Sequence, residues 1–345
     1  MNLTAPARKM PPPLRPQPRP GRWRRVPPAA FPALLGFVGL GLAWRRAAAP
    51  YLLPEGIGEV LLGVATALFG FAVLAYGAKV LRRPGVLAAE VETLPGRGGL
   101  SALSISLMAV AVALVPHARG LAEALVFVSL ALHLGFALLI VRRIVNAAPE
   151  GRSVTPMWHL HFVGFIVAAI PAAALGLRGL ALAILAITVP VAVLIWAASA
   201  RQVLRRPPPP PLRPLVAIHL SPASLFAVVA ADTGLPDLAF AFSVLSVAMF
   251  LVLLLAGPWM CRGGFTPMWG ALTFPLAAFA VAMMVQATPQ VLVTMMGFDA
   301  VAPFWRLCGA GALAMASVSI PWITFRVLRG WADGSLAAKT NAAIA

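Results

Sequence analysis

The chain contains ten long runs of apolar residues, and these runs limit its fold more than any other feature. A helix needs about 20 apolar residues to cross the hydrocarbon core of a bilayer, which is roughly 30 Å thick. In that core only helices or closed barrels satisfy the backbone, and the ten-residue alternation of barrel strands is absent from the sequence. The runs therefore predict an all-α integral membrane protein. They lie at about 29–47, 57–81, 100–116, 120–142, 157–177, 179–200, 215–232, 235–256, 267–287 and 301–328.

Composition excludes a soluble fold. Hydrophobic residues make up 61% of the 345 residues, charged residues make up 11%, and the mean hydropathy is +0.90. A soluble domain needs about a quarter charged residues to cover its surface. In a soluble protein the net charge of +17 would suggest nucleic acid. The sequence has no basic stripe with interleaved aromatic residues, so we expect the cations to lie in loops and to contact the lipid bilayer, with no nucleic-acid partner.

The breaks between the runs alternate in length. Three of them, PHARG, LRG and DTGLP, are very short, whereas the others between them are longer and mostly basic. This alternation predicts five helical hairpins in series and suggests a five-fold internal repeat. We therefore expect a disordered, Pro- and Arg-rich cytoplasmic tail at 1–28, a ten-helix transmembrane domain at 29–330, and a short cytoplasmic tail at 331–345.

The distribution of cations predicts the orientation. If the N-terminal tail lies inside, 22 of the 27 Lys and Arg residues lie on the inner side, and the other five are Arg45, Arg46, Arg119, Arg178 and Arg306. The positive-inside rule then places both termini in the cytoplasm, for an integral protein of the plasma (inner) membrane. Arg45 and Arg46 also spoil a small-residue cleavage site after the first run, so we expect that run to remain as the first helix.

Charged residues are absent from the middle of the runs, whereas pumps and ion-coupled carriers commonly place a charge there. Prolines are frequent instead, and each proline removes a backbone donor and frees the carbonyl four residues earlier. In lipid that carbonyl needs a partner, which fits either kinked helices around a water-filled centre or ordinary kinks packed against neighbours. The odd runs contain or end with Pro32, Pro116, Pro171, Pro222 and Pro275, and the even runs contain Pro190 and Pro321.

Histidines are the other polar feature of the runs, and His133, His159, His161 and His219 lie in or near them. Three interpretations are open: structural residues, polar groups at the cytoplasmic mouth of a pore, or axial ligands of a membrane haem. His161 and His219, together with Ser221, are the candidates for the pore mouth. His133 and His161 lie at different depths, which argues against haem.

The sequence shows no catalytic machinery. It contains no phosphate loop and no pairing of a nucleophile with a base. Cys261 and Cys308 lie on different segments without a CxxC spacing, so neither a disulfide framework nor a zinc site is expected. We expect a protein that is not an enzyme and that needs no cofactor or metal.

Several stretches, taken in order, resemble the tellurite-resistance/dicarboxylate transporter family, which includes the plant slow anion channels. PMWGALTFPLAAFA resembles the ninth helix of that family, where an aromatic-rich start precedes Ser/Thr-Phe-Pro or Ser/Thr-Phe-Gly. The resemblance covers about residues 29–330 with the same ten-helix count. Four other stretches agree: FPALLGFVGLGLAW, LAYGAKVLRRPGVLAAEV, TPMWHLHFVGFIVAA and HLSPASLFAVVA.

The resemblance implies a fold and a gate. It implies five hairpins around a pseudo-five-fold axis, with odd helices lining a central pore and even helices outside, in a homotrimer with one pore per subunit. A phenylalanine blocks the pore in this family, and its position matches Phe274. Pro275 would bend the helix at the waist of the pore. The sequence departs from the family at His161, where the fifth helix often has a proline.

The leading expectation is therefore an anion channel or facilitative anion transporter. The family suggests chloride, nitrate, small dicarboxylates and tellurite as substrates, and the sequence does not choose among them. A proton-coupled anion carrier that uses His161 or His219 stays open as an alternative, as do a membrane haem or redox protein and a purely structural membrane protein.

Overall fold

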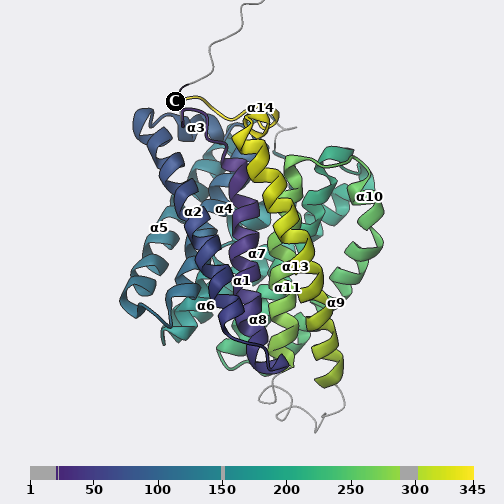
Figure 1. Ribbon diagram of the computed structural model, residues 1–345. Coiled ribbons are helices and arrows are strands. Elements are labelled where there is room, and N and C mark those ends of the chain that lie inside the picture. Colours follow the sequence, from purple (N-terminus) through teal and green to yellow (C-terminus); the bar gives the residue numbers. More distant parts are fainter. Residues whose placement is uncertain (1–20, 22, 149–151, 288–301) are drawn as a thin grey trace, which may run out of the picture.

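The computed structural model describes residues 21, 23–148, 152–287 and 302–345, and within these residues the chain is all-α (Figure 1). Nine of its helical segments are long and apolar enough to cross a membrane. They are Pro28–Tyr51, Gly56–Arg82, Leu94–Leu114, Arg119–Val145, Arg178–Arg205, Pro210–Asp232, Pro236–Leu255, Pro267–Gln286 and Ala302–Ala332. These segments confirm nine of the ten predicted spans as apolar helices of sufficient length.

The predicted span at 157–177 is shorter and irregular. It consists of a π-helical turn, η3 (His159–Val163), followed by α6 (Ile166–Ala174), and together they form a shorter apolar helix, His159–Ala174. The predicted span at 100–116 begins earlier than expected, because Thr93 caps α4 (Leu94–Leu114) by accepting a hydrogen bond from the Gly96 amide at 3.0 Å. Most of the predicted tail at 1–28 lies outside the described residues.

The long helices fall into two groups by burial. Between 67% and 83% of the apolar stretch is buried in the segments that contain α1 (Phe31–Tyr51), α4, α8 (Leu220–Asp232) and α11 (Thr273–Gln286). Only 17% to 39% is buried in α2 (Gly56–Arg82), α5 (Arg119–Val145), α7 (Arg178–Arg205), α9 (Pro236–Leu255) and α13 (Ala302–Ala332). We call α1, α4, α6, α8 and α11, with the irregular turns that precede them, the inner segments, and the second group the outer helices.

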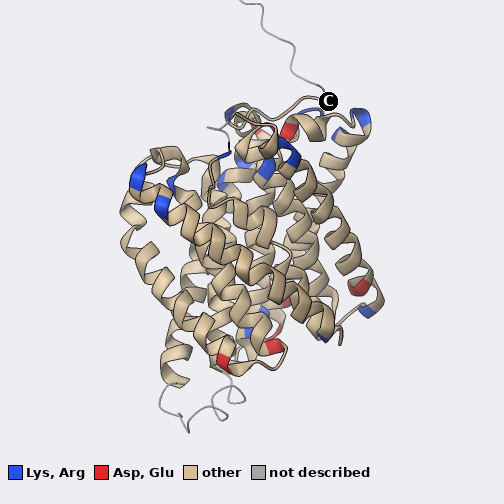
Figure 2. Cartoon of the chain, turned by 180° about the vertical axis from the view of Figure 1, so that it is seen from behind, with Lys and Arg blue, Asp and Glu red and all other residues tan. Residues whose placement is uncertain are grey.

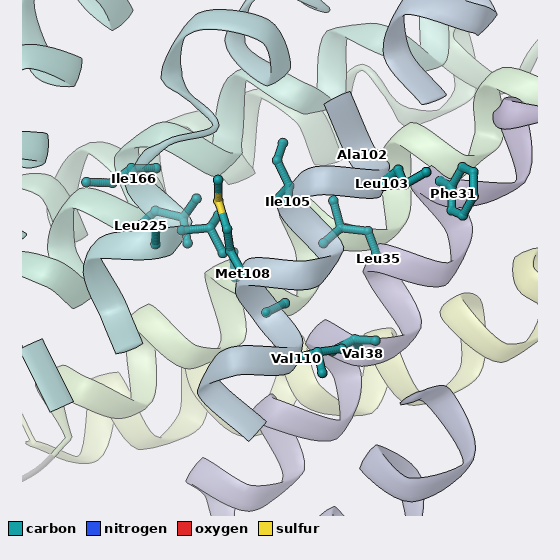
Figure 3. Packing of buried hydrophobic residues seen from close by; sticks show 14 of the residues in the cluster. Phe31, Leu35, Val38, Ala102, Leu103, Ile105, Met108, Val110, Ile166 and Leu225 are labelled. Carbon is teal, nitrogen blue, oxygen red and sulfur yellow. The ribbon is translucent and has the colours of Figure 1, made fainter. Parts of the chain in front are cut away.

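The inner segments contact one another in a closed order. α1 packs against α4, α4 against α6, α6 against α8, α8 against α11, and α11 against α1. Each inner segment also packs against the outer helix that follows it in the chain, so that α2, α5, α7, α9 and α13 cover the outside. At the centre, Met108 of α4, Ile166 of α6 and Leu225 of α8 lie next to one another in the core (Figure 3).

One end of the bundle carries residues 21 and 23–28 and the C-terminus, and we call it the terminal end. The Ala345 amide donates to the Arg24 carbonyl there at 2.8 Å. In Figure 2 the blue Lys and Arg segments of the ribbon are spread across this end, which also carries the label C. The short helices α3 (Val86–Glu90) and α14 (Ser335–Lys339) also lie there (Figure 1), and α10 (Gly257–Cys261) follows α9.

At the terminal end several inner segments are not α-helical, which differs from the expected continuous helices. Three of them begin as 3₁₀ turns: η1 (Pro28–Ala30) before α1, η4 (Pro210–His219) before α8, and η5 (Pro267–Leu272) before α11. The prolines of these stretches have no N–H to donate. Pro222 and Pro275 would clash with the carbonyls of Ile218 and Ala271 in a continuous α-helix, and both carbonyls lie in the 3₁₀ turns. The prolines therefore change the helix type as well as its direction.

A buried ion pair ties the terminal end together. The side chains of Lys79 on α2 and Glu90 on α3 are both buried, and the Lys79 ammonium donates to a Glu90 carboxylate oxygen. Lys79 also donates to the Val26 carbonyl at 2.8 Å, and the Ala343 amide donates to the same Glu90 oxygen at 3.1 Å. The pair therefore joins the start of the described chain, α2, α3 and the C-terminal residues.

Candidate pore

Two cavities lie inside the ring of inner segments. The near cavity, toward the terminal end, has a volume of about 60 Å³, and the far cavity has a volume of about 480 Å³. The residues that line each cavity come from all five inner segments, and within the described residues no outer helix lines either one. The cavities therefore follow the axis of the bundle, on the two sides of its centre.

Three side chains line both cavities: Val167 of α6, Leu225 of α8 and Phe274 of α11. The Phe274 ring faces Gly39 of α1, where an added Cβ would lie 3.2 Å from Phe274 Cδ2. The Phe274 side chain is only partly buried, although α11 is one of the most buried helices. Val167, Leu225 and Phe274 thus form an apolar boundary that the two cavities share.

Thr273 fixes the backbone that carries this ring. Its side chain is buried, and its hydroxyl lies 2.7 Å from the Gly270 carbonyl and 3.1 Å from the Pro32 carbonyl of α1. A Cβ at Gly36 would lie 2.0 Å from Thr273 Oγ1, so only glycine at that position lets α1 approach α11 this closely. The backbone is therefore held while the Phe274 ring borders open space.

The predicted kink prolines do not all lie at this site. Pro32, Pro222 and Pro275 line the near cavity, whereas Pro171 is buried within α6 and lines neither cavity. A proline has no N–H to donate, so the carbonyl four residues before it lacks a helical hydrogen bond. The three lining prolines therefore leave irregular backbone next to the near cavity.

The structure separates the predicted pore-mouth residues. Ser221 lines the near cavity. His161 does not: it is buried, and its Nδ1 lies 2.7 Å from the Ser101 hydroxyl of α4. His219 lines neither cavity, and its Nδ1 lies 2.9 Å from Nε2 of His159. These two nitrogens face each other at hydrogen-bond distance, so they cannot also flank a haem iron.

His159 was not among the expected pore-mouth residues, but it does line the near cavity. The HLH pattern showed only that His159 and His161 face different directions. The π-helical turn decides which of them faces the axis, and a turn of that kind widens the helix by one residue and cannot be read from spacing.

Charges lie at the far cavity and not at the near one. Arg45, Arg46 and Asp232 line the far cavity. Arg45 is neutralised by Glu59, with Nε 2.6 Å from Oε1 and Nη2 2.8 Å from Oε2. Arg46 is exposed and makes no hydrogen bond or ion pair within the described residues, although the Asp232 carboxylate interacts with it electrostatically. No charged residue of the described chain lines the near cavity.

These features define a class: an all-α integral membrane protein with two aligned cavities enclosed by its inner helices. The family model described as SLAC1, voltage-dependent anion channel, matches residues 25–328. The chain belongs to this family, which confirms the resemblance found in the sequence and assigns the protein to anion channels and transporters in general. A comparison with curated proteins gives no match.

Proposed function

We propose that the protein is an anion channel whose pore consists of the near and far cavities and is closed by Phe274. The observation that carries this proposal is the position of Phe274, which lines both cavities within the closed ring of inner segments. An aromatic ring in a narrow apolar passage excludes water, and an ion without its water cannot pass. Rotation of the ring into either cavity would join them into one path.

The lining includes a cation that can attract anions. The near cavity is neutral, and the far cavity is lined by the exposed guanidinium of Arg46, which makes no ion pair within the described residues, and by the Asp232 carboxylate, which interacts with it electrostatically. A channel needs only weak binding along its path, because an ion that binds tightly does not leave. Neither His161 nor His219 lines the path, so the geometry supports passive flow more than proton coupling through these residues.

For the membrane we propose that the terminal end faces the cytoplasm, in the plasma (inner) membrane. The Lys and Arg segments spread across that end support this orientation (Figure 2). We also keep the homotrimer that the family resemblance implies, with one pore in each subunit. Many large apolar side chains of the outer helices are exposed, including Phe71, Leu138 and Val318, and they suit contact with lipid or with other subunits.

The direct test of anion conduction is a reversal potential. Purified Phe274→Ala protein in planar bilayers, under a KCl gradient, is expected to reverse close to the chloride equilibrium potential. Reversal near the potassium potential, or the absence of current from folded protein, would exclude the proposed function.

Replacing Arg46 by glutamate is expected to lower the chloride-to-potassium permeability ratio roughly twofold to fivefold. Reversing one solvent-exposed charge changes the electrostatic energy of an ion beside it by about 0.5–1 kcal/mol. The effect should shrink as salt is raised, because ions screen the exposed charge. Arg306→Glu is the matched control: Arg306 is exposed at the same end but lines neither cavity. Equal changes in the two variants would show that Arg46 acts only through overall surface charge.

A further inference from the structure

The near cavity contains two polar side chains from the described part of the chain, His159 and Ser221, and both have unused hydrogen-bonding capacity. Nδ1 of His159 is buried without a partner, and the His159 side chain is only 2% exposed. The Ser221 hydroxyl makes no hydrogen bond within the described residues, whereas Ser224 on the next turn of α8 donates to the Leu220 carbonyl at 3.0 Å. An unpaired buried ring nitrogen is costly, and because this one belongs to a side chain that lines the cavity, a ligand in the cavity is the candidate for its missing partner.

The second ring nitrogen of His159 belongs to a hydrogen-bonded chain. His159 Nε2 lies 2.9 Å from His219 Nδ1, and His219 Nε2 lies 2.9 Å from the Ser199 hydroxyl of α7. The Trp196 indole N–H, also on α7, donates to the His219 carbonyl at 3.2 Å and holds that backbone. An outer helix is thus linked to the near cavity through two imidazole rings.

The neutral chain has two possible proton arrangements. In the first, His159 Nε2–H donates to His219, and His219 Nε2–H donates to Ser199, which leaves His159 Nδ1 with a bare lone pair. In the second, the Ser199 hydroxyl donates to His219 and His219 Nδ1–H donates to His159, which places the His159 proton on Nδ1. Each ring carries one proton in both arrangements, so the switch from one tautomer to the other needs no net uptake of a proton.

We propose that the near cavity binds one monovalent anion, which accepts hydrogen bonds from His159 Nδ1–H and from the Ser221 hydroxyl. His219 and Ser199 act as positioning residues, because in the second arrangement their hydrogen bonds hold the His159 proton on Nδ1. The inference rests on the proposed function, since the site contributes to flux only if the two cavities form the pore.

The charge and size of the cavity select the class of anion. Its lining is apolar apart from the two donors, and no cation of the described chain offsets a buried negative charge. The cost of moving an ion out of water rises with the square of its charge, so a dianion costs roughly four times as much as a monoanion. A volume of about 60 Å³ suits a small inorganic anion such as chloride or nitrate, with a few waters. Dicarboxylates and doubly charged oxyanions do not fit this site.

The test measures anion affinity in the open background. With Phe274→Ala, conductance is recorded against chloride concentration, and His159→Phe is then added. We expect the half-saturating chloride concentration to rise roughly tenfold, as loss of one hydrogen bond to a charged group predicts. His159→Asn should restore most of the affinity, because its amide nitrogen occupies the position of Nδ1. An unchanged half-saturating concentration in His159→Phe would overturn the proposal while leaving the channel intact, whereas silence of Phe274→Ala itself would remove both.

A second measurement does not depend on a folded His159 variant. The native sequence, with ¹⁵N-labelled histidine and reconstituted in lipid, is titrated with chloride against gluconate and followed by solid-state NMR. Chloride should move the His159 proton from Nε2 to Nδ1, and Ser199→Ala should weaken that response. A His159 tautomer that does not respond to chloride would contradict the proposed site.

Discussion

Phe274→Ala is expected to raise chloride conductance roughly tenfold to a hundredfold over the native chain. In the proposed channel, the native ring must leave its position between the cavities for the path to open, and it then loses its apolar contacts, such as that with Gly39. Burying a phenylalanine side chain is worth about 1.5–3 kcal/mol, and this energy converts to that range of rates. Alanine removes the ring and with it the barrier. Chloride efflux from liposomes, with equal amounts of each protein, measures the ratio.

Phe279→Ala is the matched control on the same helix. Phe279 is buried, stacks on Phe250 of the outer helix α9 with ring centroids 4.3 Å apart, and lines neither cavity. It should lose stability and gain no conductance. If both alanine variants conduct equally, loosened helix packing explains the flux and Phe274 is not the closure.

Lys79→Met is expected to lower the free energy of unfolding by about 3–5 kcal/mol, because it leaves the buried Glu90 carboxylate without its cation. The other Glu90 oxygen, Oε2, already has no hydrogen-bond partner. Burial raises the pKa of Glu90, so the carboxyl takes up a proton at low pH and the penalty falls. A group with a raised pKa stabilises the fold below its unfolded pKa and loses that contribution as pH rises through the folded pKa. The variant should therefore weaken further as pH rises, which denaturant unfolding in micelles at several pH values can show.

Two controls separate this ion pair from general charge effects. The double variant Lys79→Met with Glu90→Leu should recover much of the loss, since an apolar pair often replaces a buried ion pair without cost. Arg143→Met should cost less than about 1 kcal/mol, because its pair with Glu92 is partly exposed to solvent, which screens it. Equal losses for Lys79→Met and Arg143→Met would refute the special role of the buried pair.

The membrane class and most of the spans could be predicted because lipid imposes one simple rule. About 20 apolar residues and a satisfied backbone leave helices as the solution, and nine of the ten runs follow it. The 3₁₀ and π turns at the terminal end could not be predicted, because a proline such as Pro222 or Pro275 reads equally well as a kink in a continuous helix. Whether such a segment changes helix type depends on its neighbours in the bundle.

Only some residues of the candidate site could be predicted, because packing between distant segments decides the rest. Phe274 and Ser221 were singled out, and both line a cavity. His161 was singled out in place of His159, because sequence spacing places two such residues on different faces without showing which face meets the axis. Ser101, the hydrogen-bond partner of His161, lies on α4, 60 residues earlier in the chain. Contacts of that kind come from packing and leave no local pattern.

The central claim is that Phe274 divides one axial path into two compartments, and thiol accessibility tests it most directly. After Cys261 and Cys308 are replaced by serine, Ser221→Cys places a thiol in the near cavity and Val281→Cys places one in the far cavity. An anionic methanethiosulfonate reagent is then applied to either face of excised patches.

We expect the two cysteines to react from opposite sides of the membrane. Ser221→Cys should react only from the terminal end and Val281→Cys only from the other end, and adding Phe274→Ala should let each react from both sides. Modification of both cysteines from the same side while Phe274 is present would contradict the account.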